Sequence, residues 1–130
     1  FLEAFPRVKA MRDPTRGGIA ATLNELALQS GCDLEILEAA LPVSEEVRAF
    51  CGVTGLEVCN LANEGRMLVF VPEEHKNDAL DMLRAHEQGK HAAVIGRAAE
   101  RSPRPRVLLE TDVAKRILPM PSLEQVPRIC

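Results

Sequence analysis

The sequence contains no tryptophan and no tyrosine, and its only Phe, Trp or Tyr residues are four phenylalanines among 130 residues. Proteins that bind single-stranded nucleic acid stack bases on aromatic side chains, and proteins that bind nucleic-acid backbones carry an excess of positive charge. The formal net charge of this chain is −3. The composition therefore argues against a nucleic-acid partner.

The chain has four cysteines, at positions 32, 51, 59 and 130. No pair has the C-x-x-C spacing of metal and redox sites, and a chain of this length can bury a core without disulfides. We expect reduced thiols, with Cys32, Cys51 and Cys59 acting as small core residues. The three histidines do not cluster with carboxylates or thiols, so no metal site is predicted.

Apolar runs of membrane-spanning length are missing, and nothing in the sequence resembles a secretory signal. Together with reduced thiols, this predicts a cytoplasmic protein. The chain begins at Phe1 without an initiator Met, as a piece of a longer protein would. We expect a domain over residues 1–118 and an extended, mobile tail over residues 119–130 that carries the terminal cysteine.

Helices and strands of both kinds are predicted from apolar spacing and from glycine and proline positions. A helix over 13–31 is expected to be capped by Asp13 or Thr15 and to end at Gly31. The other expected elements are a half-buried strand over 32–37, a short helix over 44–51, a central strand over 67–71, a second long helix from Pro72 to Gly89, and strands over 92–98 and 106–111. Because helices and strands do not alternate strictly, we predict an α+β fold with a mixed sheet and packed helices.

The motif "MRDPTRGG" opens the first predicted helix. Two glycines at a helix start leave the free amide groups open to an anion or to a passing chain, and Arg12 and Arg16 add positive charge. Tight packing of the glycines against a neighbouring element explains the pattern equally well.

The motif "ANEGR" directly precedes the predicted central strand. A glutamate in that position, Glu64, is suited to proton transfer if it is partly desolvated. Ordinary turn chemistry also explains Asn-Glu-Gly, and spacing alone favours that interpretation.

The chain ends in "VPRIC", so that Cys130 follows a segment stiffened by Pro119, Pro121 and Pro127. Twelve extended residues reach at most about 40 Å, which is enough to carry a thiol into a neighbouring cleft. A terminal thiol is difficult to bury and easy to move. We therefore interpret Cys130 as a swinging carrier.

Together, "MRDPTRGGIAATLNELA", "LANEGRMLVFVP" and "VPRIC" resemble the C-terminal domain of the HypE family of hydrogenase maturation factors. That family belongs to the superfamily of aminoimidazole ribonucleotide synthetase, selenophosphate synthetase and thiamine-monophosphate kinase. The glycine-bearing helix start indicates the superfamily, and the Pro-Arg-Ile-Cys terminus indicates this family. The resemblance covers essentially the whole chain and implies that an N-terminal ATP-binding domain is absent from it.

The resemblance implies an unusual reaction on the terminal thiol. In the family, the carbamoyltransferase HypF loads a carbamoyl group onto the position that is Cys130 here. ATP with Mg²⁺, bound mainly by the N-terminal domain, then serves to dehydrate this group to a thiocyanate. The cyano group passes to iron held by the HypC–HypD complex, where it becomes a cyanide ligand of nickel–iron hydrogenase. A homodimer is implied for the full-length protein, and an isolated C-terminal part is expected to be inactive.

The resemblance also assigns roles to residues of this chain. Glu64 is expected to take a proton from the carbamoyl nitrogen, and Asn63 to orient the tail. The residues that match the family's helix-start motif, which lines the cleft near the phosphates and the tail, are Asp13, Thr15, Arg16, Gly17 and Gly18.

Two other functions remain open at this point. One is a small-molecule synthetase or kinase of the same superfamily, for which a C-terminal thiol is irrelevant. The other is a binding module that docks a partner without chemistry, in which Glu64 is replaceable by glutamine.

Overall fold

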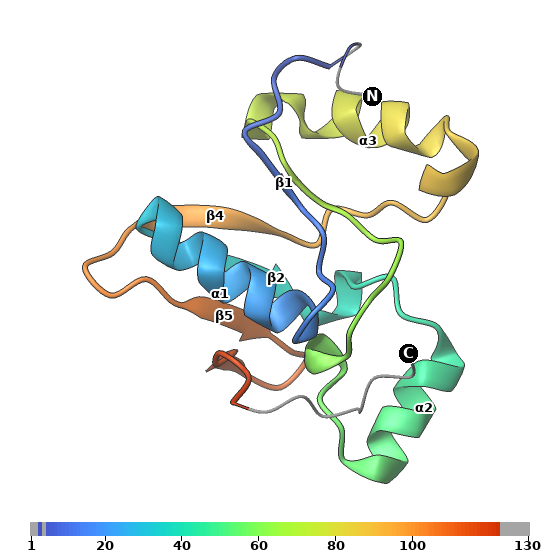
Figure 1. Cartoon of the computed structure of the whole chain (residues 1–130), viewed down its shortest axis with the longest axis vertical. Coiled ribbons are helices and arrows are strands. Elements are labelled where there is room, and N and C mark those ends of the chain that lie inside the picture. Colours follow the sequence, from blue (N-terminus) through green and yellow to red (C-terminus); the bar gives the residue numbers. More distant parts are fainter. Residues whose placement is uncertain (1–2, 4, 123–130) are drawn as a thin grey trace.

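The computed structural model describes residue 3 and residues 5–122, which form two β-sheets with helices packed on them (Figure 1). One sheet has four strands in the order β4-β2-β5-β6, and the other pairs β1 with β3. The strands are β1 Ala10–Arg12, β2 Cys32–Leu37, β3 Leu68–Phe70, β4 Gly96–Arg101, β5 Val107–Glu110 and β6 Lys115–Ile117. Strands β2 and β5 are parallel and the other neighbours antiparallel, so the predicted α+β fold with a mixed sheet is confirmed.

Helix α1, Gly18–Ser30, lies across one face of the four-stranded sheet (Figure 1). The alternation in β2 turns Leu34 and Ile36 toward this helix, and parallel pairing places Val107 and Leu109 of β5 beside them. The helix contributes a stripe of small and branched side chains to the same core, Ala20, Leu23 and Ala27. The predicted strand over 32–37 and the helix end at Gly31 are both confirmed.

Two further α-helices flank this core: α2 spans Glu45–Thr54 and α3 spans Lys76–Arg84. Figure 1 shows them at opposite ends of the molecule. Short 3₁₀ helices occur at Glu38–Ala40 (η1), Val58–Asn60 (η2), Glu73–His75 (η3) and Glu87–Gly89 (η4). The predicted short helix near 44–51 is confirmed, and it extends to Thr54 before Gly55 ends it in the left-handed conformation.

The second predicted helix is shorter than expected. We predicted one long helix from Pro72 to Gly89, but the α-helix ends at Arg84. The chain then folds back on itself: a Cβ on Gly89 would lie 2.0 Å from the carbonyl oxygen of Leu83. Glycine therefore permits a tight turn here instead of ending a continuous helix.

The expectation of a central strand over 67–71 is wrong in its placement. Residues 68–70 are a strand, but it pairs with β1 in the two-stranded sheet and not inside the larger one. Val69 and Phe70 are only partly buried. The continuous apolar run arises because the strand borders an apolar pocket, described below.

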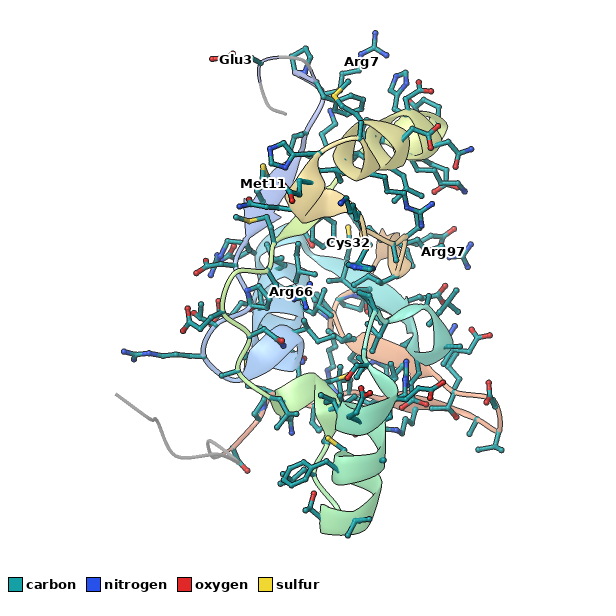
Figure 2. The ribbon with its side chains drawn as sticks, turned by 90° about the vertical axis from the view of Figure 1, so that its right-hand side faces the viewer. Glu3, Arg7, Met11, Cys32, Arg66 and Arg97 are labelled. Carbon is teal, nitrogen blue, oxygen red and sulfur yellow. The ribbon has the colours of Figure 1, made fainter. Side chains whose placement is uncertain are left out.

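The predicted core role holds for two of the three cysteines. Cys51 and Cys59 are buried, whereas Cys32 is partly exposed at the start of β2 (Figure 2). Burial raises the pKa of the Cys59 thiol to about 12. Cys59 is therefore protonated at neutral pH and is not a nucleophile.

Residues 123–130 lie outside the described residues, and with them Cys130. The division into a domain over 1–118 and a mobile tail over 119–130 therefore stays a prediction. In the described part of the chain, no helix is both long enough and apolar enough to cross a membrane.

Candidate functional site

Helix α1 begins at two consecutive glycines in the left-handed conformation, Gly17 with φ of 67° and Gly18 with φ of 62°. Gly18 is buried against η2: a Cβ on it would lie 2.4 Å from the Leu61 carbonyl oxygen and 2.5 Å from that of Cys59. No side chain can fit there. The packing role that the sequence left open for these glycines therefore applies to Gly18.

No side chain caps the start of α1, and no acidic residue lies in its first turn. The prediction that Asp13 or Thr15 caps the helix is wrong, because the left-handed glycines at 17 and 18 delay its start. Asp13 and Arg16 are exposed and Thr15 is partly exposed. The first amide groups of α1 and the positive end of its dipole are thus left without a side-chain acceptor.

The loop over 62–66 lies against this helix start. The Asn63 backbone N–H donates to the Pro14 carbonyl oxygen at 3.2 Å, and its side-chain Nδ2 donates to the Leu61 carbonyl oxygen at 3.0 Å. Two motifs that are nearly 50 residues apart in sequence are therefore joined by a backbone hydrogen bond. Asn63 therefore holds its own loop in place and also joins that loop to Pro14, before α1.

Glu64 projects into solvent from this loop. The next residue, Gly65, has a φ of 69°, which is the turn conformation that favours glycine, and Glu64 is exposed. The loop therefore has the ordinary turn chemistry that its spacing favoured, and Glu64 is not buried from water. The catalytic role assigned to Glu64 remains a prediction.

The first residues of the predicted tail run beside the helix start. Leu118 is buried, its N–H donates to the Val107 carbonyl oxygen at 2.8 Å, and its carbonyl oxygen accepts a hydrogen bond from Asn24 Nδ2 of α1 at 3.0 Å. Pro121 follows closely: a Cβ on Gly17 would lie 3.7 Å from its ring carbon Cγ. The structure thus anchors the chain at Leu118 and leads it past Gly17.

The described residues offer no group of three or more His, Cys, Asp or Glu side chains that is suited to a metal ion. The charged residues near the α1 start are instead Arg16 and Asp13, both exposed. Uncapped amide groups beside an arginine suit an anion such as a phosphate group.

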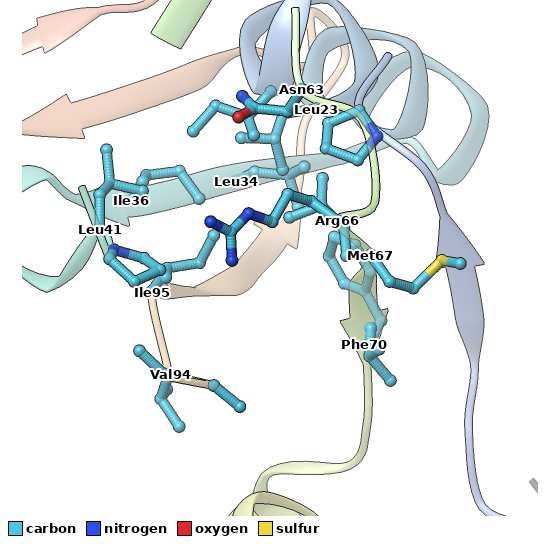
Figure 3. A pocket seen from close by; sticks show the side chains of 18 of the residues that line it. Leu23, Leu34, Ile36, Leu41, Asn63, Arg66, Met67, Phe70, Val94 and Ile95 are labelled. Carbon is cyan, nitrogen blue, oxygen red and sulfur yellow. The ribbon is translucent and has the colours of Figure 1, made fainter. Parts of the chain in front are cut away.

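An apolar pocket of about 510 Å³ adjoins the 62–66 loop, and Asn63 and Arg66 of the loop line it. Its walls come from α1, β2, β3, α3 and the segment over 92–98. Figure 3 shows Arg66 extending into this pocket, which the neighbouring Met67 also lines. Arg66 is the last residue of the motif "ANEGR", but no role was predicted for it from the sequence. The signal that could have revealed it is a basic residue placed directly before an apolar strand.

The family comparison identifies the domain. Residues 2–107 match the family described as "AIR synthase related protein, C-terminal domain". Over 130 residues the chain is 45% identical to the carbamoyl dehydratase HypE of Azotobacter vinelandii and 47% identical to that of Rhodobacter capsulatus. Each match covers 99% of this chain but 38% of the relative, so the chain spans about two-fifths of the length of these proteins.

Solved structures agree with the sequence relatives. The crystal structure of Escherichia coli HypE superposes with a TM-score of 0.89 at 43% identity, covering 99% of this chain and 40% of that one. HypE in complex with ATP gives 0.84 at 44% identity, covering 95% and 38%. A HypE–HypF complex gives 0.82 at 37% identity, covering 89% and 37%. The chain therefore belongs to the AIR synthase related family, as a C-terminal domain, and corresponds to the C-terminal part of the HypE hydrogenase maturation proteins.

Proposed function

We propose that this chain is the thiol-bearing part of an ATP-dependent carbamoyl dehydratase that makes the cyanide ligand for nickel–iron hydrogenase. The observation that carries the proposal is the meeting of three segments. The start of α1, the loop with Asn63 and Glu64, and the root of the tail at Pro121 lie together, although they are far apart in sequence.

Each segment has a place in the reaction. Cys130 carries the carbamoyl group through its sulfur, and the nine residues after Pro121 reach at most about 30 Å, far enough to return to the α1 start or to leave it. ATP, when bound, supplies the phosphoryl group that makes the carbamoyl oxygen a leaving group. One proton leaves the nitrogen as the oxygen is phosphorylated. The second leaves as the C–O bond breaks and inorganic phosphate departs, which leaves a thiocyanate on Cys130.

The described residues contribute to this reaction by binding and by proton transfer. The uncapped start of α1 and Arg16 attract the phosphate oxygens. Glu64 takes a proton from the carbamoyl nitrogen, and the exposed carboxylate becomes desolvated when the loaded tail covers it. Asn63 keeps the loop beside α1 through its hydrogen bonds to Pro14 and Leu61.

The partners and the remaining cofactor follow from the same proposal. HypF is the loading enzyme, and the HypC–HypD complex accepts the cyano group on iron. Most contacts to ATP and Mg²⁺ come from an N-terminal domain, through which the full-length protein forms a homodimer. The isolated chain of 130 residues is therefore expected to be inactive.

Intact mass spectrometry tests the proposal on a chimera in which these residues replace the matching C-terminal part of the A. vinelandii HypE. The chimera is incubated with HypF, carbamoyl phosphate and ATP. We expect an adduct that is lighter by one water than a carbamoyl group. Cys130→Ala should remain unmodified, and Glu64→Gln should stop at the carbamoyl adduct.

Glu74→Gln is the matched control, since Glu74 is exposed on η3 and outside the site. It should react like the unaltered chimera. An unmodified Cys130 in a chimera that is folded and exposed to active HypF contradicts the proposal and favours a small-molecule enzyme of the same family. Full dehydration in the Glu64→Gln variant would show that Glu64 is not the base.

A further inference from the structure

The pocket beside the 62–66 loop has the size and lining of a small-molecule site. Its volume of about 510 Å³ falls within the roughly 300–1,000 Å³ that is usual for ligand pockets. Branched aliphatic side chains from separate elements form its walls, including Leu23 of α1, Ile36 of β2 and Ile95 before β4 (Figure 3). Residues of both sheets line the pocket.

Arg66 is the cation that lacks an acidic partner at this pocket. The other charged residues that line it are paired: Lys76 with Glu73, and Arg97 with Glu35 at 2.7 Å. Arg66 makes no hydrogen bond or ion pair with any residue in the part of the chain that the structure describes. Figure 2 shows it on the loop before β3, in the middle of the molecule, whereas Arg97 lies at its outer edge.

A guanidinium among aliphatic side chains determines which ligands fit. A fully apolar ligand would take water away from Arg66 and offer no acceptor in return, which is costly. A carboxylate forms two parallel hydrogen bonds with a guanidinium, and the attached hydrocarbon fills the apolar walls. Arginine suits this arrangement because its stem packs on apolar surface while its head remains charged.

We propose that this pocket binds an amphipathic carboxylate, with the carboxylate on Arg66 and an aliphatic chain of roughly medium length along Leu34, Ile36 and Ile95. Pro14 and Ile19 beside the α1 start and Asn63 of the 62–66 loop also line this pocket, so it adjoins the site described above. The two sites share the loop over 62–66, because Arg66 follows Glu64 by two residues.

Titration with sodium decanoate tests the proposal, at concentrations below micelle formation and with the 130-residue chain. Methyl NMR signals of Leu34, Ile36 and Ile95 report on the walls. We expect saturable shifts at these methyl groups. Octanoate should bind about tenfold more weakly, because it buries two fewer methylene groups. Decanol, which lacks the charge, should also bind about tenfold more weakly.

The variant Arg66→Gln should weaken decanoate binding by about tenfold while leaving decanol binding unchanged. Arg66 is exposed, so the variant should fold normally. Arg104→Gln is the matched control, since Arg104 is exposed on the loop after β4 and does not line the pocket. It should bind decanoate as the unaltered chain does.

Three outcomes would overturn the proposal. Equal affinity for decanoate and decanol, or no effect of Arg66→Gln, would show that the guanidinium does not select a carboxylate. Shifts that spread over the surface without saturation would show non-specific binding. Self-association through the same methyl groups, measured by sedimentation, would show that a second copy of the chain occupies the pocket.

Discussion

Helices α1 and α2 end alike but begin differently. Each ends at a glycine with a φ of 72°, Gly31 for α1 and Gly55 for α2, whose N–H bonds back to a carbonyl oxygen of the last turn. At its start α2 has Ser44 as a cap and Glu45 and Glu46 in its first turn. Helix α1 starts at two left-handed glycines, without a side-chain cap and without an acidic residue.

The start of α2 is therefore stabilised by its own side chains, whereas the start of α1 leaves its amide groups available to a ligand. Caps and acidic residues each stabilise a helix start by up to about 1 kcal/mol, and α2, an exposed helix, has both. Helix α1 is held by its buried stripe and by the contact of Gly18 with η2, so it does not depend on its cap. Its unneutralised end faces the loop with Glu64 and the root of the tail.

The largest expected effect is that of Gly18→Ala. The new methyl group would meet two carbonyl oxygens at about 2.5 Å or less, and alanine disfavours a φ of 62°. We expect the free energy of unfolding in urea to fall by about 3 kcal/mol or more. Gly31→Ala is the control, because a Cβ there has nothing within 4 Å, and it should cost roughly 1–2 kcal/mol. Equal losses would mean that the contact with η2 is not what holds α1.

The second prediction concerns charge at the α1 start. In the chimera, Arg16→Glu should raise the ATP concentration needed for half-maximal dehydration by about tenfold, because it places a negative charge where phosphate is proposed to bind. Stability should change little, since Arg16 is exposed. Arg104→Glu makes the same charge change elsewhere and should leave the ATP dependence unaltered. If both variants behave alike, the uncapped end of α1 has no phosphate role.

The third prediction compares the two caps directly. Ser44 Oγ accepts a hydrogen bond from the Val47 N–H at 3.4 Å, so Ser44→Ala should cost about 1 kcal/mol in urea unfolding. Thr15→Ala changes the residue that the sequence suggested as the α1 cap. Since no side chain caps α1, this variant should stay within about 0.5 kcal/mol of the parent. A larger loss at Thr15 would reverse the comparison.

The smallest expected effect is a pH dependence at the first turn of α2. Hydrogen bonding to its own backbone N–H, and then to Ser44, holds the pKa of Glu46 below its ordinary value of 4.5. The ionised form therefore stabilises α2 above pH 4.5, and this contribution is lost as the pH falls through the lowered pKa. The hydrogen-exchange protection factors of the amides over 46–48 should fall on acidification, and Glu46→Gln should remove that change. The first turn of α1 has no acidic group and should not respond.

Much of the fold could be predicted from the sequence, because local signals and packing agree there. The alternation in 32–37 and the glycine at 31 are examples. Strands β1 and β6 were not predicted: Lys115–Ile117 is exposed throughout, so no apolar alternation indicates it. It pairs with β5 across the short turn over 111–114, so its place follows from the neighbouring strand and not from an apolar pattern of its own.

The residues proposed for the site could be named from the sequence, but their arrangement could not. The sequence indicated the glycines and the Asn63–Glu64 loop, but composition cannot show that the Asn63 N–H meets the Pro14 carbonyl oxygen. The cap at Asp13 or Thr15 was wrong because two left-handed residues in a row override the usual start signal. Arg66 was overlooked because its setting, an apolar pocket, is assembled from parts of the chain that are far apart in sequence.

The position of β2 has a consequence for the order in which the protein is made. Both neighbours of β2 in the sheet, β4 and β5, begin more than 55 residues after it ends. During synthesis, α1 and β2 therefore leave the ribosome with their apolar faces uncovered and must wait for most of the chain. Such late pairing slows folding and prolongs the exposure of apolar surface that is prone to aggregate.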